Sequence, residues 1–457
     1  MTHKSFRTSV FLLSVFLEIS DVFTKSPQAS QVCIIGAGYS GLATARYMKD
    51  YGLNFKVFEA TRYIGGTWRL DPNVGTDEDG LPLFTSQYKN LRINSPYQTM
   101  EFSGFPFPEG SASYVTGTCY YEYLKAFAKK FDLFKNIQFR SLITKVKWTG
   151  DKWKVTYMKS DTRKNITEKC NFVVVASGEF NSPNIPHFEG QEAFKGKLMH
   201  SHNYKDPEDF RDQRVLVIGG GPSGLDIAAH LVNVSSKLFH SHHLIYNEPD
   251  FGGQYMKKPD LRHFTSTGAV FTDGSTEEFE VAILCTGYNY KHPFLNHKTS
   301  GITATDKYLM PLYQHIVNIN HPTMLFVGIS KLVMTRLRDA EAQYSAALVA
   351  GKFKLPSQEE MFHHWLDHLE SIKKKNHQMK DINLIGVENM SEYLNGLHKE
   401  AGIARMLPVL PSMSVFNEMN LLEDFLNFRD YDYKIISDTQ YVKSYNPKKR
   451  PCLIYNN

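Results

Sequence analysis

The sequence predicts an α/β protein with two doubly wound parallel sheets, and three observations predict it. One pattern of apolar strand, glycine-rich turn and helix occurs twice, with the turns beginning at Gly36 and Gly219. Each turn follows an apolar run typical of a buried parallel strand and precedes a segment compatible with a helix. The length of 457 residues also exceeds the size of a usual single domain. Two domains with separate cores are therefore expected.

The first turn has the spacing of a dinucleotide-binding fingerprint. Apolar strand 31–35 leads into Gly36-Ala37-Gly38-Tyr39-Ser40-Gly41, and residues 42–48 are compatible with a helix. In such a turn the first glycine permits a tight bend, the second lets the backbone approach a pyrophosphate, and the third lets helix and strand pack closely. The phosphates then accept hydrogen bonds from free N–H groups at the start of the helix. Strand 55–58 ends at Glu59, the acid expected to hold a ribose hydroxyl.

The second turn repeats this plan with a different strand end. Strand 214–218 leads into Gly219-Gly220-Gly221-Pro222-Ser223-Gly224, and the backbone of Ser223, Gly224, Leu225 and Asp226 is expected to contact phosphates. Strand 237–240 leads into Ser241-His242-His243, with no carboxylate where the first copy has Glu59. An acid there would repel a 2′-phosphate, whereas hydroxyl and imidazole donors accept one, so this site favours NADPH over NADH. In the alternative interpretation, these histidines only cover a sheet edge.

The N-terminus differs from the rest of the chain. Lys4 and Arg7 precede an apolar core at residues 10–17, which is typical of a secretory signal peptide, assigned here to residues 1–24. The apolar core is too short to span a bilayer, and no other segment is apolar for 18 residues. We therefore expect a secreted protein without stable membrane insertion. The alternatives are residence in the endoplasmic reticulum lumen and a retained, membrane-proximal N-terminal arm.

Composition excludes several classes of function. A net charge of +5 without a lysine and arginine block interleaved with aromatics argues against nucleic acid as a partner. The odd number of cysteines leaves at least one unpaired, and the lack of a C-x-x-C motif argues against disulfide reductases. Three cysteines in or beside apolar strands are interpreted as core residues, namely Cys33, Cys170 and Cys285. The histidines of segment 362–368 have no obvious acidic or thiol partners, so no metal site is expected.

Three segments between the fingerprints carry further signals. In segment 64–68 small residues adjoin an aromatic, Thr67-Trp68, which suits backbone passing close to a flat ring system. Segment 90–96 supplies the amide of Asn94 and the hydroxyl of Ser95, although the amide could equally cap the turn before Pro96. Segment 194–204 fits the pattern F-x-G-x-x-x-H-x-x-x-Y.

These features together resemble the flavin-containing monooxygenases, a group within the class B flavoprotein monooxygenases. The resemblance covers roughly residues 32–348, and the aromatic-glycine-histidine pattern between two fingerprints is specific to this class. Tyr204 at its end favours the branch that oxygenates heteroatoms. Cys285-Thr286-Gly287-Tyr288 is similar to the family's second A-T-G-Y element, with cysteine in place of alanine, and Ala176-Ser177-Gly178 stands near the first linker.

The resemblance implies an FAD domain interrupted by an NADPH domain, with FAD residues 30–185, NADPH residues 186–284 and a second FAD and C-terminal part at 285–457. FAD would be held by the first fingerprint with Glu59, Thr67, Trp68, Asn94 and Ser95, and NADPH by the second with Ser241. NADPH would reduce FAD, and reduced FAD with O2 would give a C4a-hydroperoxide that a soft nucleophile attacks. The family's active-site asparagine maps onto Asn94, and His200 and Tyr204 are assigned to linker packing.

With its predicted signal peptide and compact length, the chain is most similar to the insect alkaloid N-oxygenases. This resemblance implies N-oxidation of a plant pyrrolizidine alkaloid such as senecionine, and leaves a homo-oligomer open. Three alternatives remain: S-oxygenation of thioethers, an NADPH oxidase of the same fold, and a catalytically inactive secreted protein that binds flavin or another ligand. A cleft is expected between the two doubly wound sheets, and the region from Leu309 onward is expected to line or roof it.

Overall fold

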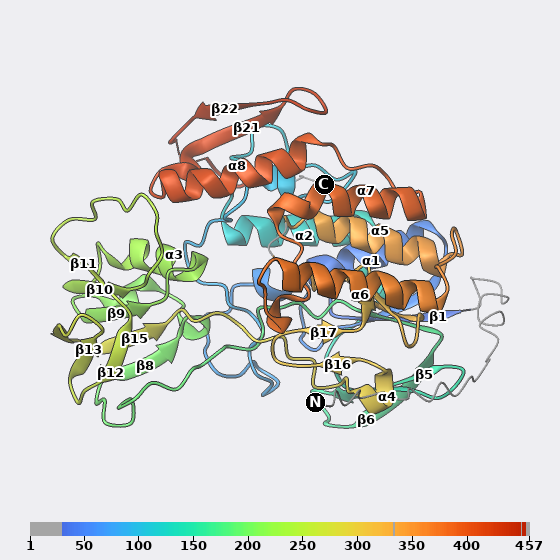
Figure 1. Cartoon of the computed structure of the whole chain (residues 1–457), viewed down its shortest axis with the longest axis horizontal. Helices are drawn as coiled ribbons and strands as arrows, with labels where there is room; N and C mark the ends of the chain where they lie inside the picture. The colour runs from blue at the N-terminus through green and yellow to red at the C-terminus, as the bar shows by residue number, and fades with distance from the viewer. Residues whose placement is uncertain (1–29, 332–333, 449, 454–457) are drawn as a thin grey trace, which may run out of the picture.

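Two parallel-stranded sheets organise the computed structural model, which describes residues 30–331, 334–448 and 450–453. The seven-stranded sheet lies in the larger lobe, and the five-stranded sheet forms the smaller lobe, green in Figure 1. The predicted α/β class with two doubly wound sheets is confirmed. The predicted signal peptide, residues 1–24, lies outside the described residues.

The first sheet carries the first glycine turn. Strand β1 lies between β2 and β7, so the chain leaves β1 where the strand order reverses, and ligands of open α/β sheets bind beside strand ends at such a point. The run from β20 to β3 is parallel. In sheet order the strands are β18 (Leu312–Tyr313), β19 (Val317–Asn318), β20 (Met324–Phe326), β7 (Phe172–Val175), β1 (Gln31–Ile35), β2 (Asn54–Phe58) and β3 (Ile137–Gln138).

The second sheet has the same arrangement around the second glycine turn. Strand β9 lies between β10 and β15, and all five strands are parallel. They come from residues 197–284, between β7 and β18 of the first sheet, so the smaller lobe is an insertion in the larger one. The boundaries at 186 and 284 stay predictions. In sheet order the strands are β11 (Tyr255–Lys258), β10 (Lys237–Ser241), β9 (Arg214–Ile218), β15 (Val281–Leu284) and β8 (Lys197–His200).

Helices and small antiparallel sheets complete the two lobes. The longer helices are α1 (Tyr39–Asp50), α2 (Gly117–Lys130), α3 (Pro222–Leu231), α5 (Leu337–Val349), α6 (Gln358–Lys374), α7 (Met390–Ala401) and α8 (Val409–Glu423), and α4 spans His297–Ser300. The antiparallel strands are β4 (Ser141–Trp148), β5 (Trp153–Lys159), β6 (Asn165–Cys170), β12 (Leu261–Phe264), β13 (Gly268–Phe271), β14 (Thr276–Glu278), β16 (Thr303–Ala304), β17 (Leu309–Met310), β21 (Tyr431–Ile435) and β22 (Tyr441–Tyr445). Within the described ranges, no helix has the length and apolar character needed to cross a membrane.

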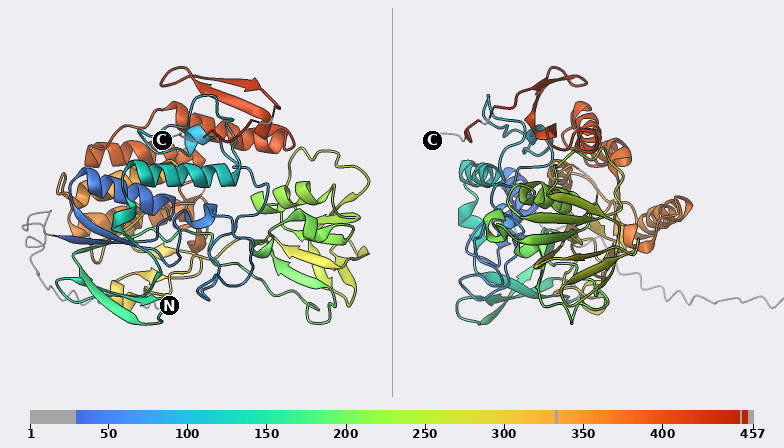
Figure 2. Two further views of the ribbon diagram at one scale, coloured as in Figure 1. Left: turned by 180° about the vertical axis from the view of Figure 1, so that it is seen from behind. Right: turned by 90° about the vertical axis from the view of Figure 1, so that its left-hand side faces the viewer.

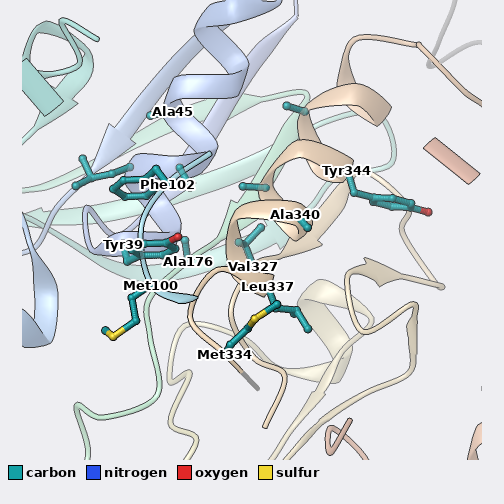
Figure 3. Close-up of a cluster of buried hydrophobic side chains, with 14 of the residues drawn as sticks. Tyr39, Ala45, Met100, Phe102, Ala176, Val327, Met334, Leu337, Ala340 and Tyr344 are labelled. Carbon is teal, nitrogen blue, oxygen red and sulfur yellow. The ribbon is translucent and has the colours of Figure 1, made fainter. Parts of the chain in front are cut away.

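The core of the larger lobe lies where α1 packs against α5, and Figure 3 shows side chains of this cluster. Tyr39, in the first glycine turn, stacks on Phe102 with ring centroids 4.3 Å apart. Helix α5 packs against α1, and its Leu337 and Ala340 belong to the same cluster. The start of α1 is therefore held rigidly, as a phosphate-binding turn requires.

The cysteines correct one sequence-based interpretation. Cys33 and Cys170 are fully buried, as expected of core residues, but they are also joined in a disulfide that links β1 to the end of β6. A second disulfide joins Cys119 of α2 to Cys452 near the C-terminus. Cys285 is free and buried. Of the three cysteines interpreted as core residues, only Cys285 is buried without forming a disulfide.

The C-terminal region contacts both lobes. Helix α8 and the β21–β22 hairpin lie above α2 in both views in which the lobes stand side by side (Figures 1 and 2). Asn417 of α8 accepts a hydrogen bond from the Tyr114 hydroxyl of the larger lobe at 2.5 Å. At the end of the same helix, the Leu422 carbonyl accepts from the N–H of Asn247 in the smaller lobe at 2.9 Å. This helix therefore spans the junction of the lobes.

Candidate active site

The three glycines of the first turn have three different surroundings. Gly36 has φ +101°, and a Cβ there would lie 2.6 Å from the Ala176 carbonyl oxygen. At Gly41 an added Cβ would lie only 1.9 Å from the Gly36 oxygen. At Gly38 the nearest atom to an added Cβ is the Gly66 Cα, 3.7 Å away. The first and third glycines thus accommodate the protein's own backbone, whereas the second leaves a cradle open at the start of α1, where a pyrophosphate fits.

The second turn has the same geometry. Gly219 has φ +119°, with an added Cβ 2.5 Å from the Cys285 oxygen, and an added Cβ at Gly224 would lie 1.9 Å from the Gly219 oxygen. At Gly221 nothing lies within 4 Å of an added Cβ. The open cradle therefore occurs again at the second glycine, at the start of α3. Both turns fit a dinucleotide pyrophosphate.

The helix itself limits which N–H groups of the second turn can meet phosphates. Pro222 has no N–H, and the N–H of Leu225 donates to the Gly221 carbonyl at 3.0 Å. Asp226 lies deeper in the helix, where the helical ladder takes its N–H. Of the four predicted donors, Ser223 and Gly224 are therefore the two whose N–H groups the helix leaves free for a phosphate.

Glu59 lies directly after β2 and spans the first turn. Its Oε2 accepts from the Ala37 N–H at 2.8 Å, and its Oε1 accepts from the N–H and hydroxyl of Thr61 at 3.0 and 2.9 Å. Burial raises the pKa of Glu59, against the effect of these hydrogen bonds. A carboxylate has about four acceptor positions, so one remains for a ribose hydroxyl. Beside it lies a cavity of about 30 Å³, also lined by Gly66 and Arg69.

Segment 64–68 lies against the first turn. The Gly65 N–H donates to the Ala37 carbonyl at 2.9 Å. Thr67 and Trp68 follow in a short 3-10 helix, Gly66–Trp68. The Thr67 hydroxyl lies 2.9 Å from that of Ser86, and the Trp68 ring packs on Tyr120 at 4.6 Å. The structure therefore brings these two predicted residues to the first site.

Strand register corrects the prediction for Ser241. Ile35 of β1 pairs with Phe58, and Ile218 of β9 pairs with Ser241, so Ser241 corresponds to Phe58 and His242 to Glu59. The Ser241 hydroxyl is buried and donates to the Pro259 carbonyl at 2.8 Å. The side chain that reaches this edge is one residue later than predicted.

His242 shares that edge with two charged groups. The Lys257 ammonium pairs with the Glu248 carboxylate at 2.9 Å, and the His242 Nε2 lies 3.5 Å from Glu248 Oε1. Burial, followed by the charge of Lys257, lowers the pKa of His242, so its imidazole is neutral at pH 7. Neither of its ring nitrogens has a hydrogen-bond partner within the described structure. Lys257, whose side chain is 41% exposed, is the donor at this edge that a 2′-phosphate would meet, whereas the His242 imidazole is buried beside it.

Asn94 is held at its side-chain oxygen and at its backbone carbonyl. Its Oδ1 accepts a hydrogen bond from the Arg429 guanidinium, and its backbone carbonyl accepts from Asn417 Nδ2 at 2.9 Å. The amide Nδ2 of Asn94 has no partner among the residues that the structure describes. Ser95 follows, half-buried. The amide oxygen thus contacts a distant residue instead of capping the local turn.

Both oxygens of the Asp226 carboxylate are engaged by side chains of the protein. Oδ1 pairs with Arg429 Nη1 at 2.8 Å, and Oδ2 accepts from the Tyr88 hydroxyl at 2.5 Å. Burial alone would raise the pKa of this carboxyl, but the charge of Arg429 and the further contacts outweigh it and lower the pKa. The sequence analysis did not identify Arg429 or Tyr88 as site residues, because neither belongs to a local motif.

The linker residues pack as expected. His200 Nε2 lies 3.0 Å from the Gly287 carbonyl, and its Nδ1 accepts from the His202 N–H. Tyr204 is fully buried and packs edge-on against Tyr88 with ring centroids 5.2 Å apart. Both residues join the inserted lobe to the larger one.

A cavity of about 340 Å³ lies elsewhere, between α6 and α7 over the β18–β19 turn. His364 and His368 of the histidine-rich segment line it together with His315. In the described part of the chain, no group of three or more histidine, cysteine, aspartate or glutamate side chains could hold a metal ion. None of the predicted site residues lines this cavity.

Two open phosphate cradles on two doubly wound sheets, with a free acceptor for ribose at the first, are the arrangement expected of an oxidoreductase with two dinucleotide-binding domains. The chain belongs to the flavin-binding monooxygenase-like family, whose model matches residues 29–244 and 250–442. It is a flavin-dependent monooxygenase.

Similar proteins extend over nearly the whole chain. A senecionine N-oxygenase of Tyria jacobaeae is 56% identical over 452 residues, covering 98% of this chain and 99% of that protein. A trimethylamine monooxygenase of Methylocella silvestris is 30% identical over 385 residues, covering 80% of this chain and 84% of that protein. Among solved structures, the S-allyl-L-cysteine S-oxygenase from Allium sativum has a TM-score of 0.81 and 27% identity, covering 88% of this chain and 95% of that one.

Proposed function

We propose that this enzyme uses NADPH and O2 to transfer one oxygen atom to the tertiary nitrogen of a pyrrolizidine alkaloid such as senecionine. The observation that carries the proposal is the 56% identity, over almost the full length of both chains, to a protein named senecionine N-oxygenase. FAD, when bound, would pass two electrons from NADPH to O2, so that one oxygen atom goes to the nitrogen and the other leaves as water. The residues of the chain bind, orient and shield the reactants.

The two turns divide the binding task. The cradle at Gly38 and the free acceptor of Glu59 suit the pyrophosphate and ribose of FAD, whereas the cradle at Gly221 suits those of NADPH. Lys257 supports a preference for NADPH because a cation attracts the 2′-phosphate, although the adjacent Glu248 reduces that attraction. Asn94 would offer its unpaired amide N–H2 to the reacting centre and does not itself exchange a proton.

A second candidate reaction is S-oxygenation of a thioether. One of the solved structures with a TM-score of 0.81 is an S-oxygenase, which supports this alternative. A thioether and a tertiary amine are both uncharged nucleophiles, and neither requires a side-chain base.

Product analysis separates these reactions. The purified yellow enzyme is incubated with air and NADPH, and with senecionine, trimethylamine or an S-alkyl cysteine. We expect the N-oxide of senecionine, with close to one product molecule per NADPH, and slower turnover of the other two compounds. We expect NADH to be at least about tenfold less efficient, which corresponds to about 1.4 kcal/mol for the missing phosphate contact. Oxygenation of the thioether alone would overturn the proposed substrate. Equal efficiency with NADH would overturn the proposed preference for NADPH.

We also propose that the protein is secreted. The apolar N-terminal segment and the disulfides Cys33–Cys170 and Cys119–Cys452 support this, because disulfides persist in oxidising compartments. We expect the full chain, expressed in insect cells, to appear in the medium with its first residues removed, between positions 20 and 30. N-terminal sequencing of the medium protein checks this. A cleaved protein that stays inside the cells would favour the endoplasmic reticulum lumen, and an uncleaved one would contradict the leader.

A further inference from the structure

Arg429 joins three parts of the molecule that lie far apart in sequence. It belongs to a short 3-10 helix, Phe428–Asp430, between α8 and β21. Its guanidinium donates to Asn94 Oδ1 through Nη2 and to the Ile93 carbonyl through Nε at 3.2 Å. Its Nη1 pairs with Asp226 of α3 at 2.8 Å. One side chain of the C-terminal region therefore contacts both the Asn94 loop and the first turn of the second nucleotide helix.

The chemistry of this contact fixes the direction of the Asn94 amide. A guanidinium has five donors and no acceptor, whereas an amide side chain has an accepting oxygen at one end and a donating N–H2 at the other. The opposite rotamer would place donors against donors. As long as Arg429 stays in place, the Asn94 oxygen faces the guanidinium and the N–H2 group points away from it.

Asp226 makes the direction of the Asn94 amide depend on the position of the inserted lobe. The Arg429 and Asp226 side chains are only 13% and 4% exposed, so each charge needs the other. The Tyr88 hydroxyl, from the larger lobe, holds the second oxygen of Asp226 at 2.5 Å. When α3 is docked, the guanidinium has its counter-charge and its place beside Asn94. When α3 moves away, the guanidinium loses its counter-charge and keeps only its contacts with Ile93 and Asn94.

We propose that Arg429 is a positioning residue, which turns the Asn94 amide into a fixed donor toward bound FAD and makes that orientation depend on the docking of α3 through Asp226. This rests on the proposed role of Asn94. Arg429 itself contacts no cofactor or substrate in this scheme and acts through Asn94.

The test is a double-mutant cycle with a control in the same region. Asn94→Ala, Arg429→Met and the double variant are compared for N-oxide formed per NADPH consumed. Arg450→Met is the control, because Arg450 also pairs with an aspartate, Asp432, but does not touch Asn94. We expect each single variant to lower the ratio about tenfold or more, and the double variant to be no worse than Asn94→Ala, because both changes remove one function. The control should keep the ratio of the unchanged enzyme.

A second readout does not depend on turnover. Backbone hydrogen exchange is measured on the purified protein for peptides covering residues 88–96 and 222–231. We expect Arg429→Met to accelerate exchange in both about tenfold, equivalent to about 1.4 kcal/mol of local stability. Asp226→Asn keeps the shape but removes the charge, so it should give a smaller acceleration in both peptides, and it replaces Arg429→Met if that variant does not fold.

The outcomes separate this inference from the function on which it rests. Full coupling in Asn94→Ala would overturn the role of Asn94 and with it the inference. Uncoupling in Asn94→Ala with full coupling in Arg429→Met would overturn only the inference. Effects that multiply in the double variant would show that Arg429 acts independently of Asn94, which also contradicts it. Unchanged exchange at residues 88–96 in both Arg429→Met and Asp226→Asn would contradict the coupling to α3.

Discussion

Gly38→Ala is expected to give a folded protein that does not retain FAD, and Gly221→Ala a folded, yellow protein that binds NADPH weakly. Both glycines have ordinary negative φ values, −77° and −75°, so alanine adopts their backbone conformation without strain. An added Cβ meets no protein atom closer than 3.7 Å at Gly38 and none within 4 Å at Gly221. The methyl group instead occupies the space that the pyrophosphate needs.

The two substitutions are expected to have a small effect on folding stability and a larger one on cofactor affinity. The free energy of unfolding of the cofactor-free protein should change by less than about 1 kcal/mol, because only a helix N-cap residue is altered. The dissociation constant of the corresponding cofactor should rise roughly tenfold to a hundredfold, as overpacking by a methyl group costs about 1–3 kcal/mol. Thermal unfolding, flavin absorbance after desalting and titration with NADPH measure these effects.

Gly41→Ala and Gly224→Ala are the matched controls. Their added Cβ atoms would lie 1.9 Å from the Gly36 and Gly219 carbonyl oxygens, inside van der Waals contact. We expect both variants to fail in folding and not only in cofactor binding. If Gly38→Ala keeps stoichiometric FAD, or if Gly221→Ala leaves the NADPH affinity unchanged, the corresponding cradle is not a pyrophosphate site.

The strands and glycine turns of the two fingerprints could be predicted from the sequence because their signals are local. The strands at 31–35 and 214–218 have the predicted bounds, and each is followed at once by its turn. Apolar runs and glycine spacing span a few residues, so a single chain displays them. Ser241 shows the limit of this method: the strand is one residue longer than its apolar pattern suggested, so the residue equivalent to Glu59 is His242.

The contacts that hold Asn94 could not be predicted. Arg429 follows it by 335 positions, and nothing around Arg429 distinguishes it from a surface arginine. The same limit applies to Cys33 and Cys170, because burial could be predicted from the sequence but the pairing required knowing that the end of β6 packs against β1. Long-range pairs of this kind follow from topology, and topology depends on where the inserted lobe leaves and rejoins the first sheet.

Asn94→Ala should bind FAD and accept electrons from NADPH, yet release hydrogen peroxide in place of the N-oxide. Asn94 is half-buried and does not contact the glycine turns, so cofactor binding should survive its truncation. What is lost is the N–H2 group, the end of the amide that Arg429 leaves free. Removal of one fixed donor from a reacting centre typically costs about a hundredfold to a thousandfold, so product per NADPH should fall at least about tenfold.

Asn94→Asp tests the donor itself. Aspartate has nearly the same shape and still accepts from Arg429, but it has no N–H2, so it should uncouple NADPH oxidation as strongly as alanine. Asn427→Ala is the control, because this exposed asparagine lies two residues before Arg429 and bonds only within its own turn. N-oxide, NADPH and peroxide are measured in one reaction. Full coupling in Asn94→Ala would reject the role of Asn94, and full coupling in Asn94→Asp alone would assign that role to the amide oxygen and its contact with Arg429.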